Sequence, residues 1–221
     1  MPGTAQRQTV SDRAAIAAVL PTAEEVSDTV GNPLDTTGPP LVGSIDVLPN
    51  GIRDAAGASP LDCLGAVTPL MRVVYEGGGV TGAAWRDYAR LGAGQTVSSA
   101  EAGVVAFGSD GEASRMFNRF VTAWRSCAGT TVTLFVSPSS TAGLELTLTD
   151  VRAEGQVLSA TVLSDGGDGT VFPTEHAVGV AADFIVDVDV AITDPDPERR
   201  VAVGRAADLV RLIQGKIAAT R

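Results

Sequence analysis

The chain has little of what enzyme and nucleic-acid-binding sites usually need. Its 221 residues include one histidine, two cysteines, and 16 basic residues against 26 acidic ones. The net charge of −10 argues against nucleic acid as a partner, because phosphate binding needs a basic surface. Two cysteines and one histidine are also too few for a typical metal site. We therefore expect no metal, no cofactor and no nucleic acid.

Long apolar runs and catalytic motifs are missing too. No stretch approaches the roughly 20 apolar residues of a membrane span. The glycine-rich "EGGGVTG" (76–82) has no Lys-Ser/Thr of a phosphate-binding loop, and no G-x-S-x-G elbow occurs. Asp165 and Asp168 in "DGGDG" are too few oxygen ligands for a calcium loop, so that stretch predicts a tight turn. Asp187 and Asp189 fit a solvated strand face better than a glycosidase pair.

What is present predicts an α+β fold, a mainly antiparallel β-sheet packed with helices. Apolar residues make up 44% of the chain, enough for a sizeable core. Periodicity and turn signals predict strands and helices in an order typical of this class. Expected helices cover 11–19, 22–30, 109–128 and 197–218, with another starting near residue 60. Expected strands include 83–91, 130–136, 143–151, 156–164, 173–181 and 184–193, and 31–60 reads as a long surface loop.

The two cysteines each fall in an expected helix. Cys127 closes the apolar stripe of helix 109–128, which Ser109 and Glu112 cap at its start and Gly129 ends. Cys63 follows a second helix start at Ser59-Pro60. From the residues alone, two inert buried thiols, a catalytic thiol paired with His176, and a disulfide all remain possible, and a metal site is short of ligands.

Four stretches of the sequence resemble a known family. "SPLDCLGAVTPLMRVVYEG" (59–77) followed by "AGVVAFGSDGEASRMFNRFVTAWRSCAG" (102–129) resembles the extracytoplasmic sensor domain of the mycobacterial PknH-type Ser/Thr kinases, a module that also occurs in related mycobacterial lipoproteins. "LPTAEEVSDTVG" (20–31) is similar to its opening helix, and "ADFIVDVDV" (182–190) to its closing strand. We expect a loose segment over 1–10 and one PknH-like sensor domain over 11–221.

The resemblance implies a bond between Cys63 and Cys127 that joins the two helices, and a location outside the cytoplasm, where disulfides persist. It also implies a non-catalytic sensor or ligand-binding domain of a mycobacterial cell-envelope protein, with the membrane reached only through an anchor absent from this chain. Kinase motifs are absent. Two alternatives stay open: a cell-envelope hydrolase or transferase, and a structural protein-interaction module.

A ligand cleft near the two cysteines is the site we expect. Four of the few aromatic residues fall close to the cysteines, and two arginines accompany them as polar anchors. The expected partner is a small apolar or amphipathic envelope molecule, or another envelope protein. The candidate contacts are Tyr75, Trp85, Arg86, Tyr88 and Arg125, with Trp124 as an aromatic neighbour that ordinary core packing explains better.

The last two strands should form a hairpin around Ala182-Asp183. In that register His176 faces Asp189 on a polar face, and we expect a structural contact between them rather than a catalytic one. The same register brings Thr174 opposite Ala191, where the resemblance implies that related domains carry a second disulfide. Phe184, Val186, Val188 and Val190 then form the core side.

Overall fold

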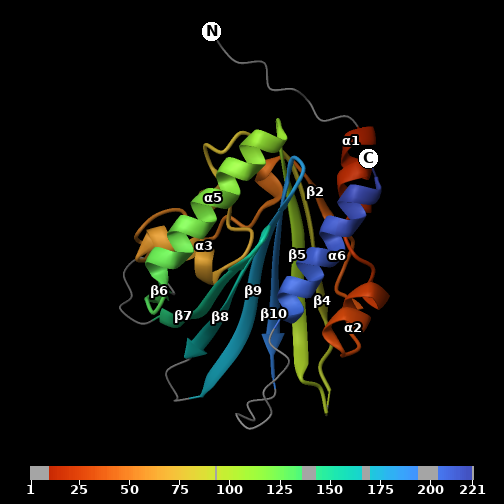
Figure 1. Cartoon of the computed structure of the whole chain (residues 1–221). Coiled ribbons are helices and arrows are strands. Elements are labelled where there is room, and N and C mark those ends of the chain that lie inside the picture. The colour runs from red at the N-terminus through yellow and green to blue at the C-terminus, as the bar shows by residue number, and fades with distance from the viewer. Residues whose placement is uncertain (1–9, 93, 136–142, 166–169, 194–203, 221) are drawn as a thin grey trace.

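A computed structural model of the chain describes residues 10–92, 94–135, 143–165, 170–193 and 204–220. Its centre is a ten-stranded sheet in the order β1-β4-β5-β10-β9-β8-β7-β6-β3, with β2 pairing on β4 and every pairing antiparallel (Figure 1). The strands are β1 Asp35–Thr36, β2 Leu41–Gly43, β3 Ala58–Ser59, β4 Val80–Ala89, β5 Val97–Phe107, β6 Thr131–Phe135, β7 Gly143–Glu154, β8 Val157–Asp165, β9 Val171–Ala181 and β10 Phe184–Ile192.

Helices cover both faces of this sheet, and we name the faces after the two longest. On the α5 face lie α3 (Leu64–Val67), α4 (Arg72–Tyr75) and α5 (Asp110–Cys127). On the α6 face lie α1 (Val10–Ala18), α2 (Ala23–Val30) and α6 (Arg205–Ala219). Short 3-10 turns occur at Ile45–Val47 and Leu61–Cys63. The α+β class and the mainly antiparallel sheet are therefore confirmed.

The two faces carry two separate cores, because alternate residues of each central strand point to opposite sides. In β10, Val186, Val188 and Val190 pack with Leu209 and Ile213 of α6. Ile185, one residue away, instead packs against the core under α5. The expectation that Val186, Val188 and Val190 face a core is confirmed. The expectation that the opposite face is polar and solvated is wrong, because α3 and α5 cover much of it.

The segment between α2 and α3 differs from the expected long surface loop. It contributes β1, β2 and β3 to the edges of the sheet, and it buries Leu34, Leu48 and Ala58. The expected helix start at Ser59 is a 3-10 turn that follows Pro60 and has no side-chain cap. The expected final helix over 197–218 is observed as Arg205–Ala219, and residues 194–203, like the expected turn at 166–169, lie outside the described residues.

Candidate functional site

The best-defined wall of the candidate site is α5. The Ser109 hydroxyl accepts a hydrogen bond from the Glu112 amide at 3.3 Å, which caps the first turn. Gly129, two residues beyond Cys127, adopts the left-handed φ of 78° that favours glycine after a helix end. Between these ends one stripe is buried, as the spacing predicts: Ala113, Met116, Phe117, Phe120, Trp124 and Cys127.

A disulfide fixes the second wall to the first. Cys63 and Cys127 are bonded, with their Cα atoms 5.7 Å apart, as expected from the resemblance. The bond holds the 3-10 turn and α3 against the end of α5. One turn earlier on α5, the Trp124 indole N–H donates to the Gly65 carbonyl at 3.0 Å. The two walls are thus tied by a covalent bond and a hydrogen bond.

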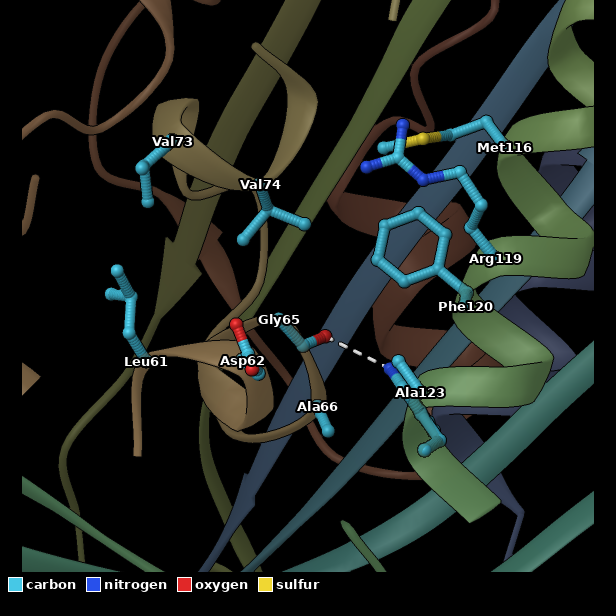
Figure 2. A pocket seen from close by; sticks show the side chains of 11 residues that line it. Leu61, Asp62, Gly65, Ala66, Val73, Val74, Met116, Arg119, Phe120 and Ala123 are labelled. Carbon is cyan, nitrogen blue, oxygen red and sulfur yellow. Dashed lines mark hydrogen bonds between the residues drawn. The ribbon is translucent and has the colours of Figure 1, made fainter. Parts of the chain in front are cut away.

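A cavity of about 260 Å³ lies between these walls (Figure 2). Its lining is mostly apolar and comes from the 3-10 turn, α3, α4 and α5: Leu61, Asp62, Gly65, Ala66, Val73, Val74, Met116, Arg119, Phe120, Ala123 and Trp124. Asp62 and Arg119 are the charged members, and both are exposed. This combination of an apolar lining with a few polar groups is typical of a small-molecule site. Among the described residues, no group of His, Cys, Asp and Glu side chains could hold a metal ion.

Behind the cavity, a buried polar network anchors its walls to the sheet. Asp187 of β10 accepts hydrogen bonds from the Tyr75 hydroxyl at 2.6 Å and from the Leu70 amide at 2.8 Å through Oδ2. Its Oδ1 lies 2.8 Å from Nε2 of His176. The other ring nitrogen, Nδ1, lies 3.1 Å from the carbonyl oxygen of Ala66, which lines the cavity. The network therefore fixes both α3 and the end of α4.

The aromatic lining of the cavity rests directly on this network. The Trp124 ring centroid is 4.6 Å from that of His176, and the Phe120 centroid is 5.7 Å from that of Tyr75 in an edge-on arrangement. His176 is 1% exposed and Asp187 is 2% exposed, so neither reaches a ligand directly. Their role is to position Phe120, Trp124 and Ala66.

The charge state of His176 follows from its partners. Both ring nitrogens face oxygens, which suits the doubly protonated ring. Burial lowers the pKa of His176, but the hydrogen bond and negative charge of Asp187 outweigh this, so its pKa lies above the ordinary value. Burial, with the charge of Asp187, raises the pKa of Tyr75 well above its usual range, so this phenol stays protonated and donates. The pair is a buried ion pair with every partner satisfied.

The register places a row of carboxyl groups beside this network. Asp87, Glu101, Asp189 and His176 face one another in turn across β4, β5, β10 and β9. Burial, with the neighbouring charges of Asp189 and Asp87, raises the pKa of Glu101 to about 9. Burial also raises the pKa of Asp189, to about 6. These three acidic residues line an open cavity of about 340 Å³.

The predicted hairpin register is confirmed, but the hydrogen-bond partner of His176 differs. The turn lies at Ala182-Asp183, His176 pairs with Asp189, and Thr174 pairs with Ala191. His176 nevertheless bonds Asp187, its diagonal neighbour on the same face. The reason is that Asp187 lies under Leu70 and Tyr75, whose donors hold it, whereas Asp189 accepts from the Glu101 amide at 3.2 Å.

The structure does not bring the predicted ligand contacts together in one cleft. Tyr75 is buried in the core under α5, and Trp85 is half-buried on the same face, donating to the Val47 carbonyl at 2.7 Å. Tyr88 lies on the α6 face, where its hydroxyl donates to the Pro21 carbonyl at 2.6 Å. Arg86 pairs with Ala102 of that same face. Arg125 is exposed on α5 and is not part of the cavity lining.

The cavity lies between the two cysteine-bearing segments, but none of the five predicted ligand contacts lines it. Of the aromatic set, Trp124 lines the cavity. None of the other lining residues was predicted as a contact: Leu61, Asp62, Gly65, Ala66, Val73, Val74, Met116, Arg119, Phe120 and Ala123. Met116 and Phe120 were identifiable from the sequence as members of the buried stripe that ends at Cys127, and this membership was the available signal. Nothing in the sequence pattern singled out Arg119.

Comparison with known proteins places this geometry in a family. The model of the PknH-like extracellular domain matches residues 11–216. The chain belongs to the PknH-like extracellular domain family. The fold is similar to the crystal structure of the extracellular domain of PknH from Mycobacterium tuberculosis, with a TM-score of 0.76, 21% identity, and coverage of 97% of this chain and 98% of that one. No curated protein sequence matches the chain.

Membership of this family also indicates where the protein is located. It is an extracellular domain, in agreement with the expected extracytoplasmic location and with the disulfide. Among the described residues, no helix is long and apolar enough to cross a membrane.

Proposed function

We propose that this chain is a non-catalytic sensor domain that binds a small apolar or amphipathic molecule of the cell envelope in the cavity between α5 and the Cys63 segment. The observation that carries the proposal is the way this cavity is built. A disulfide, the Trp124 to Gly65 hydrogen bond and the Asp187 network hold its apolar walls in place from three sides. Such preorganisation lowers the entropic cost of binding.

The proposal is of binding rather than catalysis because of where the titratable groups lie. The single histidine is buried and committed to Ala66 and Asp187. General acid–base work requires a group within hydrogen-bond reach of the substrate, and His176 has no such access. In the proposed role the domain is exported as a lipoprotein or forms the outer part of a larger membrane protein.

Intrinsic fluorescence offers a direct test, because Trp124 lines the cavity and Trp85, the other tryptophan, does not. In a Trp85→Phe background, a ligand in the cavity should change the Trp124 emission. Native mass spectrometry of protein purified from its own host identifies a carried ligand, which is then titrated. Ala123→Leu should weaken that binding about tenfold or more, because the larger side chain occupies part of the space that the ligand needs.

The matched control is Ser126→Leu, an exposed position on the same helix. It adds the same side chain to α5 outside the cavity lining and should leave binding unchanged. If ligand binding survives Ala123→Leu in a folded protein, the molecule binds elsewhere and the proposed site is wrong.

A further inference from the structure

A second hollow of different chemistry adjoins the cavity on α5. That hollow has a volume of about 300 Å³ and is lined by Gly77, Gly78, Gly79, Glu112, Arg115, Met116 and Arg119. Met116 and Arg119 line both spaces. An apolar space therefore adjoins a space with two guanidinium groups and a glycine loop. A molecule long enough to occupy both would meet apolar walls at one end and cations at the other.

The two arginines are available to a ligand. Among the described residues, no carboxylate lies within ion-pair distance of the Arg119 guanidinium. Arg115 has a single long contact, 3.9 Å from Glu112. Both side chains are exposed on α5. In a chain whose net charge is −10, two such guanidiniums facing one hollow form a local positive site.

The glycine loop adds backbone donors to the same hollow. Gly77 and Gly79 have φ of 76° and 80°, a conformation that costs glycine little. A side chain on Gly78 would lie 3.3 Å from Phe107 and 3.0 Å from the Tyr75 carbonyl, so glycine suits this path of the loop beside the end of β5. Within the described chain the amides of Gly77 and Gly79 make no hydrogen bond to the protein, which leaves them free to donate.

Charge also sets a direction along the groove. Figure 2 shows Arg119 reaching from α5 past Phe120 toward Met116, while Asp62 lies across the cavity beside Leu61 and Gly65. An anionic group is thus attracted to the Arg119 end and repelled from the Asp62 end. Glu112 opposes an anion in the second hollow, but one carboxylate faces two guanidiniums there.

We infer that the ligand is a single-chain anionic amphiphile, with its apolar chain in the cavity at Phe120 and Trp124 and its phosphate, sulfate or carboxylate head at Arg115 and Arg119. The inference rests on the proposed function and adds the class of head group and its contacts. A cavity of about 260 Å³ lies below the roughly 300–1,000 Å³ of drug-sized sites, so it takes one chain and not a two-chain lipid or a bilayer. Charge-assisted, bidentate contacts suit arginine with such oxyanions.

Calorimetry with simple probes tests this, using decyl phosphate below its micelle concentration, decyl maltoside, decyltrimethylammonium and inorganic phosphate. Decyl phosphate should bind at least tenfold more tightly than the neutral and cationic chains, and phosphate alone should bind far more weakly than decyl phosphate. Arg119→Gln should weaken decyl phosphate about tenfold or more while leaving decyl maltoside unchanged. Arg125→Gln, on the same helix outside both spaces, is the matched control and should bind as the unaltered protein does.

The outcomes separate this inference from the function on which it rests. If decyl maltoside and decyl phosphate bind equally well and both depend on Ala123, the cavity binds apolar chains and the head-group assignment is overturned. If Arg119→Gln and Arg125→Gln weaken decyl phosphate binding equally, the head-group assignment is also overturned, because the effect is then general electrostatic attraction. If no decyl probe binds, the inference fails together with this choice of site.

Discussion

His176 bonds Asp187 and not the residue that faces it across the hairpin. Nε2 lies 2.8 Å from Asp187 Oδ1 although Asp189 is the registered partner. The reason is the chain segment that covers this face of the sheet. Asp187 lies beneath the chain segment that carries Leu70 and Tyr75, and their donors complete its coordination. The pairing of β9 with β10 determines which residues lie opposite each other. The segment that covers them determines which aspartate bonds His176.

Replacing Asp187 should therefore cost far more stability than replacing Asp189. Breaking a buried ion pair by removing one partner typically costs about 3–5 kcal/mol, so Asp187→Ala should lower the free energy of unfolding by about that amount. Asp189→Asn keeps an oxygen for the Glu101 amide and should cost about 1 kcal/mol or less. Urea unfolding of the two variants measures both. Similar losses would mean that the network does not hold the sheet to α3 and α4.

The carboxyl row should make the protein less stable as the pH rises. Glu101 has its pKa raised to about 9 and Asp189 to about 6, in both cases mainly by burial. Each binds its proton more tightly in the folded than in the unfolded protein, so stability is greatest below the unfolded values near 4 and falls through the folded values. His176, whose pKa is also raised, acts in the same direction above about pH 6.5.

Thermal unfolding between pH 5 and pH 9 tests this dependence. Between pH 5 and pH 9 the free energy of unfolding of the unaltered protein should fall by at least about 1.4 kcal/mol, the equivalent of one pKa unit. Glu101→Gln, which mimics the neutral acid, should remove much of the loss. A melting temperature that rises toward pH 9 would contradict the sign.

Loss of the disulfide should destabilise the fold and release one wall of the cavity. The bond closes a loop with a sequence separation of 64, for which the chain-entropy model gives about 4 kcal/mol. Cys63→Ser with Cys127→Ser should lower the free energy of unfolding by roughly this amount, measured in urea. Alkylation of the unreduced protein is the companion test, and two added labels in the unaltered chain would disprove the bond.

A second disulfide should form where related domains are expected to carry one. Thr174 and Ala191 face each other on β9 and β10. As a non-hydrogen-bonded pair, their Cα atoms should lie about 4.5 Å apart, within disulfide geometry. Thr174→Cys with Ala191→Cys should oxidise spontaneously, lowering the intact mass by two hydrogens. The bond should add up to about 3 kcal/mol of stability. Two free thiols after oxidation would argue against this position as the vacated pair.

Local signals predicted the parts of the fold that depend on local chemistry. Helix α5 follows from its caps and its stripe, and the β9–β10 hairpin follows from alternation alone. Burial of Asp187 could not be predicted, because "FIVDVDV" alternates like a strand with one solvent-exposed face. The segment that covers Asp187 carries Leu70, more than 100 residues away in the sequence. The predicted cleft, in contrast, could have been corrected from sequence. Adjacent positions on a strand point to opposite faces, which separates Trp85 from Arg86.

The first and last described helices share one face of the sheet. Ile16 of α1 lies in the same core as Ile213 and Ile217 of α6, and Lys216 forms an ion pair with Glu25 of α2 at 2.7 Å. Figure 1 shows the end of α6 close to α1. A tether attached at either end would leave from this side of the molecule, while the cavity opens on the other. In the proposed anchored role, force on such a tether would act first on the α6 face, whereas the cavity lies on the α5 face.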